Sequence, residues 1–204
     1  MIVSVHIPKS GGSSFRQNLI QEYGDQLWVD YSRQWSRTDA PLANIPTGIK
    51  CLHGHFEADA FESCFTNHIH ITWIRHPVSR IVSLYNHILL IPDMENTYIR
   101  EIHVNKPNLV EFAEIDWVRN HMLQYIGTKL PEDFAFIGIL EEYEESIKRC
   151  ANILSWRHVP VPIWSNRNTD SSKTLLTKEE SKKILQLNRE DMDWYQAAKS
   201  LHST

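Results

Sequence analysis

The sequence predicts an α/β protein with three layers, in which a mainly parallel central sheet lies between helices on both faces. Short apolar runs rich in β-branched residues alternate with segments of helical periodicity, the pattern of strands joined by crossover helices. The first run, Ile2–Ile7, leads through a loop with two glycines into a helix. A length of 204 residues suits one sizeable core, so we expect a single domain over residues 1–204.

The expected strands are short apolar runs that end at polar or turn-forming residues. They lie at residues 2–7, 27–31, 49–52, 70–74 and 134–140. In a parallel α/β sheet, ligands bind at the carboxyl ends of the strands. We therefore expect the loops after Ile7, Leu52, Ile74 and Leu140 to meet at one edge of the sheet and to form the site.

The expected helices follow apolar residues spaced three and four apart. Pro77 starts a long helix, because proline favours the first helical turn, and Gly127 ends a helix expected over residues 109–126. Thr177 and Glu180 form a capping box for a helix that runs through Leu187. Further helices are expected to open at Phe15 and to lie at residues 58–65, 145–154 and 190–201. We expect loops at 32–48 and 156–176, and residues 92–108 show no regular pattern.

The composition is that of a globular protein without a strong global charge. Hydrophobic residues make up 42%, charged residues 23%, and the formal net charge is −4. We therefore expect no nucleic-acid partner and no stable membrane insertion, since no run approaches the roughly 20 apolar residues of a membrane span. The three cysteines are widely spaced and the N-terminal apolar run is too short for a signal peptide. These features favour a cytoplasmic location.

The first chemical motif is a P-loop-like phosphate-binding loop, Pro8–Ser14, between a strand and a helix. Its two glycines let backbone N–H groups approach an anion, and the helix start adds the positive end of its dipole. A Walker A loop places its lysine after the glycines, beside a hydroxyl that holds Mg²⁺, whereas Lys9 precedes them. This order favours a nucleotide site without a magnesium-bound γ-phosphate. An ordinary strand–turn–helix connection is the alternative.

The second motif runs from Arg75, at the end of a strand, to Ser83 in the helix that Pro77 starts. A guanidinium group binds phosphate oxygens in a bidentate manner, so Arg75 and Ser83 together form a candidate phosphate site. In the alternative reading, Arg75 caps the sheet edge or pairs with an acid, and Ser83 is a small packing residue.

Both motifs resemble those of carbohydrate sulfotransferases, most closely the heparan sulfate 2-O-sulfotransferase-like group and its bacterial relatives. Val5–Phe15 is similar to the 5′-phosphosulfate loop of that family, and Ile74–Tyr85 to its 3′-phosphate motif. Phe136–Tyr143 resembles the strand-to-helix segment that follows the core. The family usually has aspartate where this chain has His76, so this position is a departure.

The resemblance implies that the protein binds 3′-phosphoadenosine 5′-phosphosulfate (PAPS), releases 3′,5′-bisphosphoadenosine and requires no metal. The residues implied to hold the 5′-phosphosulfate are Lys9, Ser10, Gly11, Gly12, Ser13 and Ser14. Arg75 and Ser83 are implied to hold the 3′-phosphate. In the loop at 156–176, the residues Arg167, Thr169 and Lys173 resemble a late segment that closes over the cofactor. A solvated polar loop is the alternative for this segment.

The third motif, His53-Gly54-His55, matches a His-Gly-His of the same family group. The resemblance implies that His55 is the general base, that His53 supports it, and that Lys9 neutralises charge on the leaving oxygen. Imidazole, with an unperturbed pKa of about 6.5, suits removal of a hydroxyl proton near neutrality. Half of a metal site and a plain structural role are the alternatives for this pair.

The leading hypothesis is a PAPS-dependent sulfotransferase that acts on a carbohydrate or another hydroxyl-bearing acceptor by in-line attack. One alternative is a P-loop nucleotide-dependent kinase, which the missing Gly-Lys-Ser/Thr sequence disfavours. The other is a non-catalytic module that binds PAPS or phosphate, which the presence of His55 disfavours.

Overall fold

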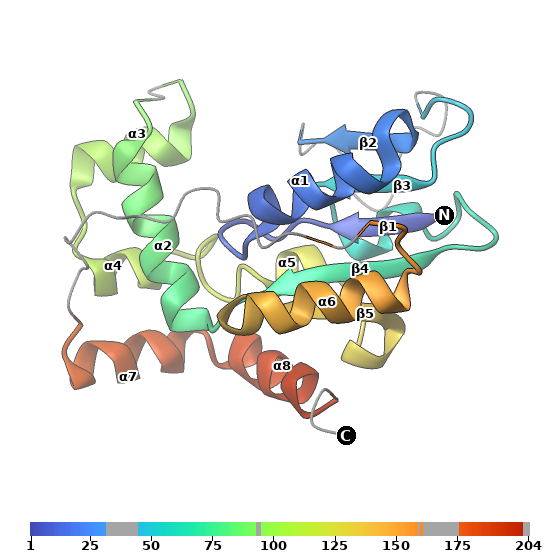
Figure 1. Ribbon diagram of the computed structural model, residues 1–204. Coiled ribbons are helices and arrows are strands. Elements are labelled where there is room, and N and C mark those ends of the chain that lie inside the picture. The colour runs from blue at the N-terminus through green and yellow to red at the C-terminus, as the bar shows by residue number, and fades with distance from the viewer. Residues whose placement is uncertain (32–44, 93–94, 159, 161–175, 202–204) are drawn as a thin grey trace.

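The computed structural model describes residues 1–31, 45–92, 95–158, 160 and 176–201. Its centre is a five-stranded sheet in the order β2-β3-β1-β4-β5 (Figure 1), and each pair of neighbouring strands is parallel. The strands are β1 (Ile2–Val5), β2 (Leu27–Asp30), β3 (Cys51–Gly54), β4 (Ile69–Ile74) and β5 (Phe134–Ile139). The predicted fold class and the five predicted strands are confirmed, with β3 displaced by two residues from its expected position.

The α-helices occupy the connections between strands and the C-terminal part of the chain. They are α1 (Gly12–Tyr23), α2 (Pro77–Leu90), α3 (Thr97–Asn105), α4 (Leu109–Glu114), α5 (Leu123–Ile126), α6 (Tyr143–Ile153), α7 (Lys178–Leu187) and α8 (Arg189–Ser200). Short 3-10 turns are η1 (Gly24–Gln26), η3 (Ala58–Phe61), η4 (Pro131–Asp133) and η5 (Leu140–Glu142). The predicted capping box of Thr177 and Glu180 is present at the start of α7.

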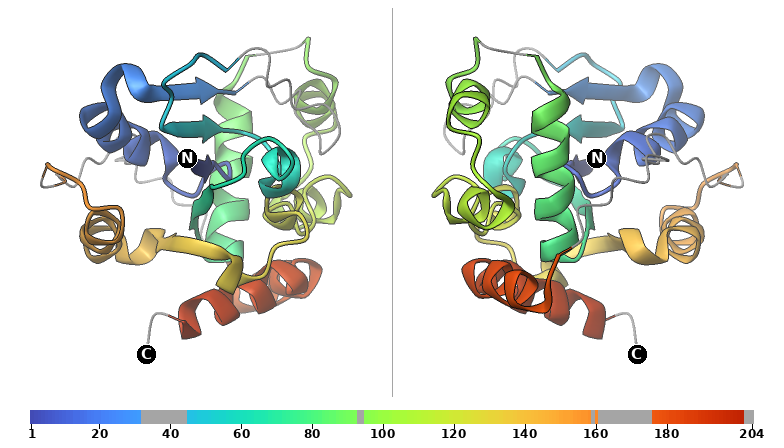
Figure 2. Two further views of the ribbon diagram at one scale, coloured as in Figure 1. Left: turned by 90° about the vertical axis from the view of Figure 1, so that its right-hand side faces the viewer. Right: turned by 90° about the vertical axis from the view of Figure 1, so that its left-hand side faces the viewer.

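Helices cover both faces of the sheet, as the side view in Figure 2 shows. On one face, α1 and α6 pack Phe15, Leu19 and Ile147 against the inward residues of the sheet. On the other face, η3, α5 and α8 contribute a second cluster that includes Phe61 and Trp194. Successive side chains of each strand point to opposite faces of the sheet, so they pack into two apolar cores, one on each face.

A third apolar cluster lies beyond the carboxyl edge of the sheet. It is built from α2, α3, α4 and α7 around Ile81, Ile102, Phe112 and Ile184. In Figure 1 these helices stand to the left of the strands, and α2 extends from the sheet into the group. The connection from β4 into α2 therefore joins the sheet to a separate helical cluster.

The helix expected over residues 109–126 is not continuous, and this prediction is wrong. The helix α4 ends at Glu114, and Asn120 adopts a left-handed φ of 44° before α5 begins. The backbone N–H groups of Met122 and Leu123 donate to the carboxylate of Asp191 at the start of α8. These tertiary hydrogen bonds replace the bonds that a continuous helix would make.

A buried ion pair joins α2 to α8 beside this turn. Arg80 and Asp191 have no exposed surface, and Nη2 of Arg80 lies 3.6 Å from Oδ2 of Asp191. Nη1 of Arg80 lies 3.1 Å from Nδ1 of His121. Arginine has no acceptor atom, so Arg80 is the donor of this hydrogen bond. The carboxylate of Asp191 thus serves two backbone donors and one buried cation, so it fixes the position of α8 relative to α2.

In the described part of the chain, no helix combines the length and the apolar character that crossing a bilayer requires.

We predict that Asp191→Ala lowers the free energy of unfolding by about 3–5 kcal/mol, because it leaves the buried guanidinium of Arg80 without a counter-charge. Urea denaturation measures the change. The matched control is Asp193→Ala, since Asp193 is an exposed partner of Arg189 in the same helix, and we expect less than about 1 kcal/mol there. Equal losses in the two variants would contradict this account of Asp191.

Candidate active site

Four loops meet at the carboxyl edge of the sheet, as the sequence predicts. The backbone N–H of His6 after β1 donates to the carbonyl of Gly54 at the end of β3, at 2.8 Å. Nη1 of Arg75 after β4 lies 3.4 Å from the carbonyl oxygen of Lys9. Leu140 after β5 contacts the same loop, since a Cβ added at Gly11 would lie 2.6 Å from its Cδ1 atom.

The loop after β1 turns sharply and starts α1 at Gly12. Lys9 and Gly11 both have left-handed φ angles, 68° and 91°. Gly12 lies directly against the imidazole of His6, where an added Cβ would come within 2.0 Å of the ring. Only glycine therefore allows this loop and the His6 ring to occupy their observed positions together.

The start of α1 fits an anion. The N-cap residue Gly11 provides no side-chain hydrogen bond, so the first N–H groups of the helix and its positive dipole end face the loop. The side chain of Ser10 is fully buried, and its Oγ has no hydrogen-bond partner among the described residues. Ser14 is buried and Ser13 is exposed. A polar group held in the loop would satisfy the orphan hydroxyl of Ser10.

Two cations lie beside this loop. Burial lowers the pKa of Lys9, and the neighbouring charge of Arg75 lowers it further. Burial also lowers the pKa of Arg75, which the carboxylate of Glu141 partly offsets. His87 on α2 is a third basic group of the set, since its pKa is lowered by burial and by the charge of Lys9. Like charges held this close favour a ligand with more than one negative charge.

The position of Ser83 on α2 follows from the way the helix begins. Glu141 accepts a hydrogen bond of 2.9 Å from the backbone N–H of His76, and Pro77 takes the first helical position. Ser83 lies two turns further along the same helix and is partly exposed. The carboxylate thus orients the start of α2, the helix that carries Ser83 and His87 further along.

Three histidines cluster at the ends of β1 and β3. The ring of His6 stacks on His53 with centroids 5.1 Å apart and lies 4.6 Å from the ring of His55. The hydroxyl of Tyr31 lies 3.2 Å from Nδ1 of His6, and its ring lies 4.6 Å from that of His55. Burial lowers the pKa of His6, and the nearby charges of Lys9 and Arg16 lower it further. The phosphate loop and the His-Gly-His motif are therefore parts of one site.

The two histidines of the His-Gly-His motif have different environments. His53 is 1% exposed, and its Nδ1 lies 2.9 Å from Oγ of Ser4. Burial lowers the pKa of His53 to about 3, so its ring stays neutral. His55 is partly exposed at the sheet edge. Of the two residues, only His55 reaches the surface, and its Nε2 atom is buried.

Glycine between these histidines is a packing requirement. Gly54 lies opposite Asp30 on the neighbouring strand β2. An added Cβ at Gly54 would lie 1.6 Å from the carbonyl oxygen of Asp30, and no backbone shift compatible with the ladder relieves such a contact. The glycine lets β2 approach and brings Tyr31 to the histidine cluster.

The structure brings together the predicted residues Lys9, Ser10, Gly11, Gly12, Ser14, Arg75, His53 and His55, with Ser13 on the exposed side of α1 and Ser83 further along α2. The predicted residues Arg167, Thr169 and Lys173 lie outside the described residues.

The sequence reasoning missed His6, Arg16 and Tyr31 as parts of the site. His6 follows Ser4 by two positions, and His53 and His55 have the same spacing in the adjacent strand. Residues two apart in a strand share a face, so the pairing of β1 with β3 would have predicted the cluster.

Comparisons with known proteins point to one family. The model described as "Sulfotransferase family" matches residues 1–196. The structure of mouse sulfotransferase SULT7A1 complexed with PAP aligns with a TM-score of 0.56 at 15% identity, covering 100% of this chain and 88% of that one. A sulfotransferase from Alicyclobacillus acidocaldarius aligns with a TM-score of 0.52 at 12% identity, covering 98% and 94%. No curated protein matches significantly in sequence.

We predict that the protein loses stability as the pH falls from about 6.5 toward 3. In this window the unfolded chain protonates His53, whereas burial keeps the folded ring neutral, since its pKa is about 3. The free energy of unfolding therefore falls by about 1.4 kcal/mol per pH unit for this residue. His6, whose pKa is also lowered, adds to the effect.

Chemical denaturation between neutral and acidic pH measures this slope. His53→Gln should flatten it, whereas the same change at the exposed His158 should leave the slope between about pH 6.5 and 5 as in the wild type, since the Glu22 carboxylate that contacts His158 titrates below this range. An unchanged slope in His53→Gln would show that His53 is not the responsible group.

Proposed function

The chain belongs to the sulfotransferase family, and we propose that it transfers a sulfuryl group from PAPS to a hydroxyl of a carbohydrate-like acceptor, with His55 as general base. The observation that carries this proposal is the convergence of an anion-binding loop, two cations and a partly exposed histidine at one sheet edge. The mouse sulfotransferase with the same fold is complexed with PAP, which supports a 3′-phosphoadenosine cofactor here.

The loop after β1 fits the 5′ end of this cofactor. In the proposed complex, the N–H groups at the start of α1 and the hydroxyl of Ser10 bind the phosphosulfate, with Gly11, Gly12, Ser13 and Ser14 forming the cradle. Arg75 and Ser83 bind the 3′-phosphate. When bound, the cofactor supplies the sulfuryl group and leaves as the bisphosphate.

Lys9 stabilises the charge that grows on the leaving side. Its ammonium group lies in the loop itself, and burial strengthens its electrostatic effect because little water screens it. The left-handed backbone at Lys9 is part of the turn that leads into α1. Arg75, which donates to the carbonyl of Lys9, orients the same segment.

His55 removes the proton from the acceptor hydroxyl at one of its ring nitrogens. The rings of His6 and Tyr31, each with its centroid 4.6 Å from that of His55, restrict its orientation. His53 supports this arrangement from behind, since it is buried, neutral and stacked on His6. In this proposal His53 acts as a positioning residue.

The proposal also specifies the class of acceptor, a carbohydrate. It rests on the resemblance of the His-Gly-His and phosphate motifs to the heparan sulfate 2-O-sulfotransferase-like group. Tyr31, whose ring lies 4.6 Å from that of His55, supplies an aromatic face near the base on which a sugar ring can pack. We further propose that the chain forms a single domain and acts in the cytoplasm, to which its three free cysteines are suited.

The first test is calorimetric titration with 3′,5′-bisphosphoadenosine and, separately, with ATP, both without magnesium. We expect binding of the bisphosphate, and a loss of about 10–100-fold in Lys9→Ala and in Arg75→Ala, because each change removes a charge-assisted contact. Lys148→Ala, at an exposed position on α6, is the control and should bind as the wild type does. Absence of bisphosphate binding, or tighter binding of ATP than of the bisphosphate, would overturn the proposed donor.

The second test separates binding from catalysis at His55. We expect His55→Ala to lower kcat by about 10²–10⁴-fold while the Kd for the bisphosphate stays unchanged, because a general base acts only in the transfer step. Transfer from PAPS to a panel of sugar and phenol acceptors provides the assay, and His158→Ala is the control. Wild-type turnover in His55→Ala would refute this residue as the base, and transfer to phenols alone would refute the carbohydrate acceptor.

A further inference from the structure

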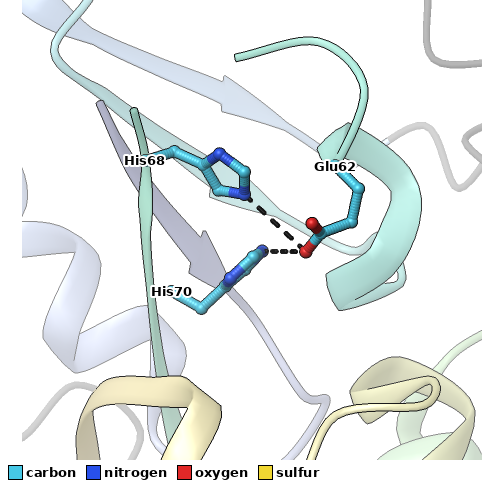
Figure 3. Close-up of side chains that lie close together, drawn as sticks. All are labelled: Glu62, His68 and His70. Carbon is cyan, nitrogen blue, oxygen red and sulfur yellow. Dashed lines mark ion pairs between the residues drawn. The ribbon is translucent and has the colours of Figure 1, made fainter. Parts of the chain in front are cut away.

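A second cluster of chemically active side chains lies at the opposite edge of the sheet. Figure 3 shows Glu62, His68 and His70 pointing toward one another, with one carboxylate oxygen facing both imidazoles. One ligand atom from each residue lies within 4.8 Å of the others. His70 is paired with Val3 at the beginning of β4, whereas Arg75 follows the end of the same strand. The cluster is therefore separate from the proposed active site.

The sequence places these residues together through local structure. His68 and His70 are two positions apart in an extended segment, so their side chains lie on the same side. Glu62 follows η3, whose residues pack against that side of the sheet. The carbonyl of Ala58 in η3 lies 2.9 Å from Nε2 of His70 and fixes η3 over the strand.

The distances are close to those of a tetrahedral metal site. Oε1 of Glu62 lies 3.7 Å from Nε2 of His68 and 3.9 Å from Nε2 of His70. Ligand atoms around a tetrahedral zinc ion, each ~2.0–2.2 Å from the metal, are separated by ~3.3–3.5 Å. A contraction of about 0.2–0.6 Å brings the carboxylate oxygen to this distance from both imidazoles. The ligand nitrogens of the two imidazoles, which lie within 4.8 Å of each other, must approach by up to about 1.5 Å, which side-chain rotations can supply.

The hydrogen bonding of His68 prepares it as a ligand. Its Nδ1 lies 2.9 Å from the carbonyl oxygen of Phe65, and a carbonyl accepts only, so Nδ1 carries the proton. The lone pair of the ring is then on Nε2, the atom that faces Glu62. Donation of the second ring N–H to a backbone carbonyl is the usual outer-shell arrangement of a metal-binding histidine.

Two existing contacts must be exchanged when an ion enters. Nε2 of His70 now donates to the carbonyl of Ala58, so this ring must lose or move its proton. Lys129 forms an ion pair with Glu62, and its side chain must swing away. That chain is long and flexible and reaches the surface, so its displacement is easily accommodated.

An ion can reach the cluster from solvent. His68 borders a surface hollow of about 330 Å³, which Met1, Asn67 and Ile69 also line. The carboxylate of Glu62 is exposed, with 43% of its side-chain surface accessible. Water in this region can supply the fourth ligand.

We propose that Glu62, His68 and His70 form a site for a divalent zinc-class ion, completed by water. Two imidazoles and one carboxylate are donors that suit zinc, whereas magnesium and calcium prefer oxygen donors alone. The ion ties the end of η3 to the start of β4 and to the segment between them, and it stabilises the folded chain. It takes no part in sulfuryl transfer, because it lies at the far edge of the sheet.

The test is a titration of the full, tag-free chain with Zn²⁺ in competition with a chromophoric chelator. We expect one equivalent to bind and to raise Tm. His68→Ala and Glu62→Gln should each weaken binding by at least about tenfold, since each removes a ligand. Lys129→Met should strengthen binding, because it removes the cation that competes for the carboxylate. This last change distinguishes a metal site from a purely structural cluster.

The control is His158→Ala, which removes an exposed histidine that contacts Glu22 elsewhere on the surface. It should bind Zn²⁺ as the wild type does. Both His68→Ala and Glu62→Gln alter residues near the surface, so both variants are expected to fold, and circular dichroism checks this. Absence of one-equivalent binding in the wild type, or wild-type affinity in both ligand variants, would overturn the proposal.

Discussion

The organisation of the active edge depends on close packing around the ring of His6. Gly12 lies against one side of this ring, and His53 stacks at 5.1 Å on another. Because the ring is held between the phosphate loop and the end of β3, the two motifs cannot move independently. The lowered pKa of His6 follows from the same packing, since burial and the neighbouring basic groups all oppose its protonation. A neutral aromatic ring thus joins the phosphate loop to the pair of histidines for which we propose the role in proton transfer.

Much of this arrangement follows from local sequence, because the strands, the glycine loop and Pro77 are determined by nearby residues. The convergence of Lys9, His55 and Arg75 was predictable for a further reason, since the carboxyl ends of parallel strands share one edge. The prediction of one helix over 109–126 was wrong because apolar periodicity does not report long-range hydrogen bonds. The carboxylate of Asp191 accepts hydrogen bonds from the backbone N–H groups of Met122 and Leu123 and interrupts the helix there. Such a bond joins segments about 70 residues apart along the chain.

The α3 helix was not predicted, for a different reason. It is amphipathic but short, and it buries only Ile102 fully, so its apolar pattern is weak. Its clearest signal is Asn96, whose side chain accepts hydrogen bonds from Tyr98 and Ile99 at the start of the helix. The contacts of His6 were not predicted because the order of the strands in the sheet was not known from the sequence. The adjacency of β1 and β3 places the His6 ring beside His55. Long-range polar contacts and strand neighbours were thus the missing information.

The separate apolar cluster of α2, α3, α4 and α7 has a consequence for how the protein opens. A group of helices with its own core can unfold locally while the sheet stays intact, which amide hydrogen exchange detects as a distinct cooperative unit. The buried pair of Arg80 and Asp191 resists this opening at the first turn of α2. The proposed doubly charged ligand, which would span Lys9 in the sheet loop and Ser83 on α2, would resist it one turn further along, so ligand occupancy and local folding of the helical unit would be thermodynamically coupled.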